Sequence, residues 1–291
     1  MGNKLEKRAN LERRLHEQSL KDQEPIRSLA SAQSVQHSTD LFVKHNSPIR
    51  LPDEFGTIDC ACVIHDKLYG WEYVDKLYNM LSRHLTPKVR LHVYTEHHRS
   101  VPPHMIKHVL DEWPGISGPK KSWWYKIQMF NSEHHAGPML YFDLDTVITG
   151  NIDWMWGLPP RFFYSIKDFR SIWKPTDVGI NSSIMWWDTT QFNYVWSEFL
   201  GQGLTYITKQ YHGDQDFLTE VIPNKDKRYL DPSKIKSWRW QALDGGFDFR
   251  TRKYRHPNTG TKIDNNTSVL VLHGDPKPAD ISDPLIKHHW Q

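Results

Sequence analysis

The sequence contains few cysteines, no long hydrophobic run and little excess charge of either sign. Its two cysteines, Cys60 and Cys62, stand one residue apart in an apolar segment. That spacing suits neither a disulfide framework nor a Cys-x-x-Cys metal site, and it places both side chains on one face of a strand. We therefore expect reduced cysteines and a cytoplasmic location.

The sequence also shows no pattern typical of a membrane anchor or an export signal. The apolar stretches are far shorter than the roughly 20 residues that a membrane-spanning helix needs, and residues 1–40 lack the apolar core of a signal peptide. Lysine and arginine together number 37 against 34 for aspartate and glutamate, a formal net charge of +3. This balance argues against a nucleic-acid partner, which would require basic residues to dominate one face.

The first 56 residues differ in composition from the rest. Residues 3–24 have the pattern of a polar helix with a thin leucine stripe, and residues 27–56 are rich in Ser, Gln and Pro, as linkers are. We therefore predict a polar helical and linker extension over residues 1–56 and a single globular domain over residues 57–291.

A strand–helix–strand unit opens the globular part. Residues 57–64 are apolar and β-branched, residues 70–85 carry apolar side chains at helical spacing, and residues 89–94 alternate as a strand does. Two strands joined by a helix in this way form a parallel pair, and ligands of such folds bind at the carboxyl ends of the strands. The predicted fold class is therefore α/β.

An aspartate pair follows a later strand. A second helix is predicted at residues 123–130, and a strand at residues 139–142 runs directly into Asp143 and Asp145. Carboxylates at i and i+2 after a buried strand point the same way and repel each other unless a divalent cation lies between them. Such oxygen ligands suit Mn²⁺ or Mg²⁺. The simpler interpretation is a pair of loop carboxylates that cap the next helix.

Two classes of enzyme use an aspartate pair in this setting. In phosphatases of the haloacid-dehalogenase type the first aspartate is a nucleophile and the second a general acid, but the motif stands on the first strand of the domain. In nucleotide-sugar glycosyltransferases of the GT-A type the pair follows a nucleotide-binding half-domain. A complete strand–helix–strand unit precedes Asp143, so its position favours the second class.

Several short motifs resemble, in the family's order, the GT-A glycosyltransferases of family 8, which include glycogenin and bacterial galactosyltransferases. They are YFDLDTVITGNID around the aspartate pair, SWWYKIQMF before it, and GINSSIMWWD, HGDQDFLTEV and VLVLHGDPKP after it. The resemblance covers residues 57–280. It implies a Rossmann-like, mostly parallel central sheet flanked by helices, with a nucleotide-binding half at residues 57–150 and an acceptor half at residues 151–291.

The resemblance also implies a metal site and a donor site. Asp143 and Asp145 would bind Mn²⁺ or Mg²⁺, which bridges the diphosphate of the donor, and His273 would be a further ligand. In glycogenin-like members this histidine stands three residues before the glycine, a position that Val271 holds here. The remaining residues implied at the diphosphate are Lys126, Gly274 and Lys277.

Further polar residues would face the sugar. Asn181 and Ser182, together with Ser183, interrupt an apolar strand, where they either bind the donor sugar or form a β-bulge. Asp214 and Gln215 begin a predicted helix and would reach the anomeric carbon, unless Asp214 serves only as the cap of that helix.

Residues that follow the first strand would lie near the nucleotide base and ribose. Asp66 or Tyr69 could contact them, and a plain turn is the alternative. Trp123 and Trp124 fall in a core-forming segment, so we expect them to pack in the core rather than to bind sugar.

The sequence thus predicts a glycosyltransferase that uses a metal ion and a nucleotide-sugar donor, with a UDP-sugar expected. Its acceptor would be a glycan, a lipid or a protein, and the family resemblance implies retention of anomeric configuration. An inverting enzyme would need a carboxylate base, for which Asp244 and Asp248 are candidates. A phosphatase using the same aspartates and a catalytically silent sugar-binding descendant of the fold remain the alternatives.

Overall fold

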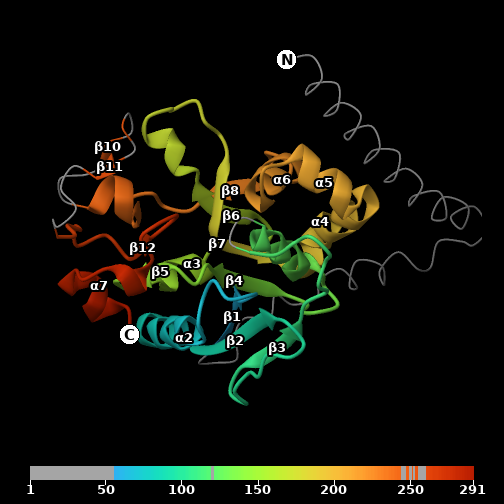
Figure 1. Cartoon of the computed structure of the whole chain (residues 1–291), viewed down its shortest axis with the longest axis horizontal. Helices are drawn as coiled ribbons and strands as arrows, with labels where there is room; N and C mark the ends of the chain where they lie inside the picture. The colour runs from blue at the N-terminus through green and yellow to red at the C-terminus, as the bar shows by residue number, and fades with distance from the viewer. Residues whose placement is uncertain (1–55, 119–120, 244–246, 249–250, 252, 255–259) are drawn as a thin grey trace, which may run out of the picture. The chain divides into compact units, whose positions relative to one another are not determined.

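The structure is a computed structural model that describes residues 56–291 except 119–120, 244–246, 249–250, 252 and 255–259. The predicted polar helix at residues 3–24 lies outside the described residues. A seven-stranded sheet with the order β3-β2-β1-β4-β7-β6-β8 runs through the described part (Figure 1). Its strands are β1 (Thr57–Val63), β2 (Lys88–Thr95), β3 (Ile106–Val109), β4 (Pro138–Phe142), β6 (Phe163–Lys167), β7 (Ile180–Asp188) and β8 (Lys227–Tyr229).

The sheet is mostly parallel. All its strands run in one direction except β7, which is antiparallel to β4 and to β6. Helix α2 (Glu72–His84) connects β1 to β2, and these two strands pair in parallel with Cys60 opposite Leu91. The predicted strand–helix–strand unit and the predicted fold class are confirmed. Because β1 and β4 are parallel neighbours, their carboxyl ends lie at the same edge of the sheet.

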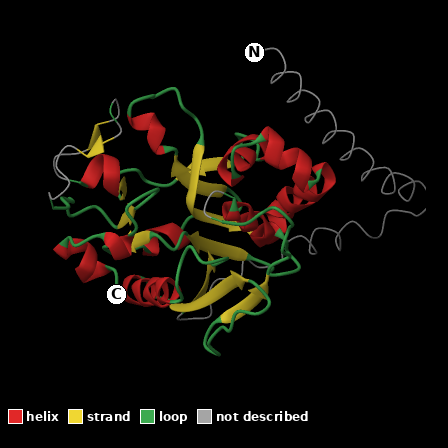
Figure 2. Ribbon diagram, in the orientation of Figure 1, coloured by secondary structure: helices red, strands yellow, loops and turns green. Residues whose placement is uncertain are grey.

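Helices cover both faces of the sheet (Figure 2). Cys60 and Cys62 are free thiols that point to one face, where they pack in an apolar cluster with Leu77 of α2. Ala61 points to the other face and belongs to a second cluster with Trp124. The prediction that both cysteines share one face of a strand is therefore confirmed. The helices of the second face are η1 (Ser122–Phe130), α4 (Thr189–Gln202), α5 (Leu204–Gln210) and α6 (Asp214–Val221).

The helix predicted at residues 123–130 is present as η1, but it is wound as a 3₁₀ helix of nine residues. Such helices seldom exceed three or four residues, because their hydrogen-bond geometry is poorer than that of the α-helix. Every residue from Trp124 to Phe130 is buried, including the charged Lys126. We infer that the packing of these buried side chains stabilises the long 3₁₀ helix, which places Lys126 in the interior.

A small three-stranded sheet places the segment around residues 269–272 next to the aspartate pair. Its strands are β5 (Thr146–Ile148), β12 (Val269–Val271) and β9 (Ile235–Ser237), in the order β5-β12-β9. Thr146 lies opposite Val271, and the backbone N–H of Leu272 donates to the carbonyl oxygen of Asp145 at 3.3 Å. This pairing explains how residues more than 120 positions apart in the chain meet at one site.

The remaining elements are short. They are α3 (Asp153–Trp156), η2 (Phe169–Ile172), η3 (Trp238–Ala242), β10 (Phe247–Asp248), β11 (Lys253–Tyr254), η4 (Pro278–Asp280) and α7 (Pro284–His289). Among the described residues, none of the helices has the length and apolar character that crossing a bilayer requires.

Candidate active site

A cavity of about 350 Å³ opens at the carboxyl ends of β1 and β4, within the range of roughly 300–1,000 Å³ that is usual for ligand pockets. Val63 at the end of β1 and Asp143 after β4 contribute to its wall. All the predicted site residues line this cavity except Asp66. They are Tyr69, Lys126, Asp143, Asp145, Asn181, Ser182, Asp214, Gln215, His273, Gly274 and Lys277.

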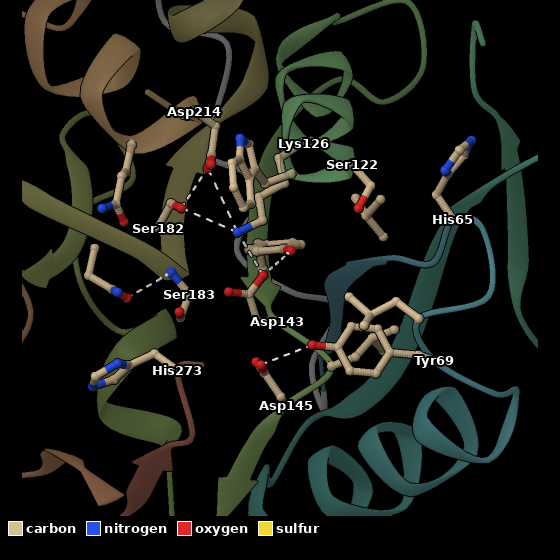
Figure 3. A pocket seen from close by; sticks show the side chains of 18 of the residues that line it. His65, Tyr69, Ser122, Lys126, Asp143, Asp145, Ser182, Ser183, Asp214 and His273 are labelled. Atoms are coloured by element: carbon tan, nitrogen blue, oxygen red, sulfur yellow. Dashed lines mark hydrogen bonds and ion pairs between the residues drawn. The ribbon is translucent and has the colours of Figure 1, made fainter. Parts of the chain in front are cut away.

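Lys126 lies between two aspartates that come from different elements (Figure 3). Its Nζ is 2.8 Å from Oδ1 of Asp143 and 3.7 Å from Oδ2 of Asp214. The lysine side chain is only 10% exposed. Burial alone would lower the pKa of Lys126, but the carboxylates of Asp143 and Asp214 outweigh it and raise that pKa. The lysine is therefore a fixed positive charge in the cavity wall.

The two aspartates of the pair have different partners. Asp143 accepts a hydrogen bond from the hydroxyl of Tyr141 at 2.6 Å, in addition to its ion pair with Lys126. Asp145 accepts from the hydroxyl of Tyr69 at 2.9 Å and from Nζ of Lys277 at 2.6 Å. Each carboxylate is thus held by one tyrosine and one lysine.

The pKa values of the two aspartates move in opposite directions. Burial raises the pKa of both carboxyls, but for Asp143 the Lys126 ammonium outweighs burial and the pKa is lowered. For Asp145, burial and the neighbouring Asp143 charge prevail over the attraction of Lys277, and the pKa is raised. An additional cation near the pair would favour the ionised form of both carboxyls.

Strand β7 is irregular where its polar residues stand. The pairing of β6 with β7 shifts between Ser165 and Ile166, so that Ile166 lies opposite Asn181 while Ser165 lies opposite Met185. The β-bulge interpretation is therefore confirmed, and the bulged residues also line the cavity, while binding of the donor sugar stays a prediction. Within the segment, Oδ1 of Asn181 accepts from the backbone N–H of Ser183 at 3.0 Å.

Ser182 links the bulge to helix α6. Its hydroxyl donates to Oδ2 of Asp214 at 2.5 Å and accepts from Nζ of Lys126 at 3.2 Å. Asp214 is the first residue of α6, but the N-cap is Gly213 and no side chain caps the helix. The interpretation of Asp214 as a simple cap is therefore wrong. Its side chain turns toward Ser182 and Lys126, and the next residue, Gln215, also lines the cavity.

The C-terminal motif reaches the cavity through His273 and Gly274. Nε2 of His273 lies 2.7 Å from the hydroxyl of Ser237, and its ring stacks on Phe169. Burial lowers the pKa of His273 to about 4, so the ring is neutral at neutral pH. Gly274 has φ +77°, and a Cβ there would stand 3.1 Å from the guanidinium of Arg239. Both its φ angle and its surroundings thus favour glycine.

Asp66 forms a turn and does not line the cavity. It has a positive φ of 62°, and its carboxylate oxygens accept from the backbone N–H groups of Lys67 at 2.8 Å and Gly118 at 2.9 Å. These contacts match the turn interpretation of the segment after β1. Of the two candidate bases for an inverting reaction, Asp248 does not line the cavity and Asp244 lies outside the described residues.

Trp123 packs against the second apolar cluster, as predicted, and it also lines the cavity. Its ring stacks on His212 with centroids 5.7 Å apart, and its Nε1 stands 3.1 Å from where a Cβ of Gly213 would be. Within the described part of the chain, Nε1 of Trp123 is buried without a hydrogen-bond partner. A ligand atom could satisfy it. The position of Trp123 in an apolar, aromatic segment gave no sign that it borders the cavity, and the sequence carries no signal for His212.

Comparisons with solved structures identify the fold. No family model matches the sequence, and no curated protein matches it closely enough to be a relative. The galactosyltransferase LgtC, in complex with donor and acceptor sugar analogues, aligns at 13% identity with a TM-score of 0.54 over 80% of this chain and 94% of LgtC. An active-site mutant of LgtC aligns at 12% identity over the same shares, with a TM-score of 0.56.

The apo form of the glycosyltransferase GlyE from Streptococcus pneumoniae is also similar. It aligns at 14% identity with a TM-score of 0.54, over 81% of this chain and 60% of GlyE. This chain therefore spans less than two thirds of GlyE. The likeness to LgtC and GlyE shows that the described part of the chain has the GT-A glycosyltransferase fold.

Proposed function

We propose that this chain is a metal-dependent glycosyltransferase that takes a nucleotide sugar, with UDP-sugar as the expected donor, and passes the sugar to a glycan, lipid or protein acceptor. The observation that carries the proposal is one cavity in a GT-A fold that gathers Asp143, Asp145, Asp214, Lys126 and Lys277. Residues 57–150 and 151–291 both contribute to its wall, as a nucleotide-binding half and an acceptor half would.

The donor atoms at the cavity fit a divalent cation. Asp143 and Asp145 supply carboxylate oxygens, which Mn²⁺ and Mg²⁺ prefer, and both are held by tyrosine hydroxyls in the way that outer-shell groups orient ligands. His273 is neutral, and its Nε2 lies 2.7 Å from the hydroxyl of Ser237. Ligand atoms of Asp143, Asp145 and His273 do not all lie within 4.8 Å of one another, so His273 would have to move to join the two aspartates at one ion. When bound there, the cation would supply a positive charge that holds the donor diphosphate and favours its departure.

The protein's own charges would act on the two ends of the bond that breaks. That bond joins the anomeric carbon to a diphosphate oxygen. A bond from the acceptor oxygen to the anomeric carbon replaces it, and the proton of the acceptor hydroxyl would pass to the departing diphosphate. Lys277 would exchange its contact with Asp145 for the departing diphosphate. Asp214, fixed by Ser182 and Lys126, would stabilise positive charge at the anomeric carbon. We propose retention of configuration, on the strength of the family 8 resemblance.

Hydrolysis of a nucleotide sugar is the direct test of this function. With purified protein, we expect slow release of UDP from a UDP-sugar in Mn²⁺, and loss of that release in EDTA. Asp145→Asn should reduce the rate more than about 100-fold, because changes outside the ligand shell alone cost 10- to 100-fold. Release of nucleoside diphosphate is measured by coupled assay across a panel of nucleotide sugars.

The outcomes separate the alternatives. Nucleotide binding without turnover would support the catalytically silent descendant. Hydrolysis of phosphate monoesters that depends on Asp143, without any action on nucleotide sugars, would support the phosphatase.

A further inference from the structure

A second cluster of polar side chains lies on β1, away from the cavity. Asp59 on β1, His92 on β2 and His135 in the loop before β4 meet there. Asp59 is four residues before Val63, which lines the cavity, so about 13 Å of strand separates the two sites. The trio, which we call the histidine cluster, is independent of the cavity residues and of the proposed transferase activity.

The atoms of this cluster are close enough to share one ion. Oδ1 of Asp59 lies 2.8 Å from Nε2 of His92, and Oδ2 of Asp59 lies 3.9 Å from Nε2 of His135. One ligand atom from each residue can be chosen so that all lie within 4.8 Å of one another. The side chains are 14%, 5% and 11% exposed, so the site is shielded but open to solvent.

We propose that Asp59, His92 and His135 bind a zinc ion or a similar late first-row divalent cation. Two imidazole nitrogens and one carboxylate oxygen are a common ligand set of Zn²⁺, and they differ from the oxygen-rich set that suits Mn²⁺. Tetrahedral ligands about 2.0–2.1 Å from the ion stand roughly 3.4 Å apart. His92 contacts Oδ1 of Asp59 at 2.8 Å and His135 lies 3.9 Å from Oδ2, so small movements of these side chains would bring one carboxylate oxygen and both nitrogens to this spacing.

Neighbouring residues supply the outer contacts that a metal site requires. Arg90 donates to both carboxylate oxygens of Asp59, with its Nη2 2.6 Å from Oδ2. Nδ1 of His92 lies 2.8 Å from Nε2 of His108, so the ring nitrogen that does not face Asp59 is also engaged. Such contacts fix the orientation of a carboxylate and the tautomer of a histidine ligand. An ion here would join β1, β2 and the loop that follows η1.

Zinc binding to the whole chain tests this proposal. After removal of metals with a chelator, equilibrium dialysis against ZnCl₂ should show one more tightly bound zinc per chain in the wild type than in His135→Gln. The affinity at that site should fall at least about 100-fold, since even outer-shell changes cost 10- to 100-fold. Zinc should also raise the Tm of the wild type by several degrees more than that of His135→Gln.

Two controls make the result specific. His134→Gln changes the adjacent residue, which is outside the trio, and should keep the zinc. Asp145→Asn removes a predicted ligand of the cavity and should also keep it. Among the described residues, the side chain of His135 makes one long hydrogen bond, 3.4 Å to the carbonyl of Pro138, beside its contacts with Asp59 and His92, so its replacement should not unfold the protein. Equal zinc content in the wild type and His135→Gln would overturn the proposal.

Discussion

Replacement of Lys126 by methionine is expected to lower the free energy of unfolding by about 3–5 kcal/mol, the usual cost of removing one partner of a buried ion pair. The lysine is 10% exposed and contacts both Asp143 and Asp214. Without it, the negative charges of Asp143 and Asp214 would be buried in the cavity wall without this ion-pair partner, and burial disfavours the ionised form of a carboxyl. Lys277 would remain as the partner of Asp145. Methionine preserves the volume of the side chain, so the effect reports on charge.

Thermal and urea unfolding measure this change. A domain of this size shifts by about 2–4 °C for each kcal/mol, so Tm should fall by roughly 10 °C. Lys121→Met is the matched control, because Lys121 is exposed and its side chain, within the described part of the chain, donates to the carbonyl of Gly115. It should leave Tm nearly unchanged. Equal Tm values for the Lys126 and Lys121 variants would refute the role of Lys126 as the counter-charge.

The loss of stability in Lys126→Met should depend on pH. Without the lysine, burial would raise the folded-state pKa of Asp143 above its unfolded value, and it would raise further the pKa of Asp214, which is already above its usual value. A carboxyl with a raised pKa destabilises the fold only above its unfolded pKa, where it must be ionised in the unfolded chain. The difference in Tm from the wild type should therefore be full at pH 7 and shrink as the pH falls toward about 4.

Asp214→Asn is expected to lower kcat for sugar transfer or hydrolysis by about 100- to 1,000-fold, as the loss of one preorganised charge or dipole does elsewhere. Asparagine can still accept from Ser182, so the shape of the site is kept. If Asp214 acts on the anomeric carbon and not on the nucleotide, the KM for the donor should change little. Burial raises the pKa of Asp214, so removal of its charge should not lower Tm.

Asp216→Asn is the control for this second prediction. Asp216 stands two residues later on the same helix and completes the second Asp-x-Asp triplet, but it does not line the cavity. Its variant should keep kcat within a few-fold of the wild type. A kcat for Asp214→Asn equal to that for Asp216→Asn would remove Asp214 from the proposed chemistry.

The spacing of apolar residues along the chain was sufficient to predict the first strands and the first helix of the central sheet. Residues 57–94 show strand, helix and strand periodicities that differ clearly from one another, and the structure confirms that unit. The strand before Asp143 also carried its own signal, a short apolar run after a Gly-Pro turn. The resemblance to a family then pointed to dispersed positions, and those positions line one cavity, apart from Asp66.

Contacts between distant segments could not be predicted in the same way. The position of Lys126 between Asp143 and Asp214 depends on the buried 3₁₀ helix, whose apolar sequence resembles any core segment. The histidine cluster was missed because Asp59, His92 and His135 lie on three separate segments with no local motif. Only the parallel pairing of β1 with β2 and the return of the chain before β4 bring them together.

A thermal-shift titration with Mn²⁺ and a panel of nucleoside diphosphates tests the central claim most directly. A ligand at 100 times its dissociation constant adds about 2.7 kcal/mol to the free energy of unfolding, or several degrees in Tm. We predict a rise with UDP that requires Mn²⁺ and is absent in Asp145→Asn. No rise with any nucleoside diphosphate, in protein shown to be folded, would contradict the nucleotide-sugar site.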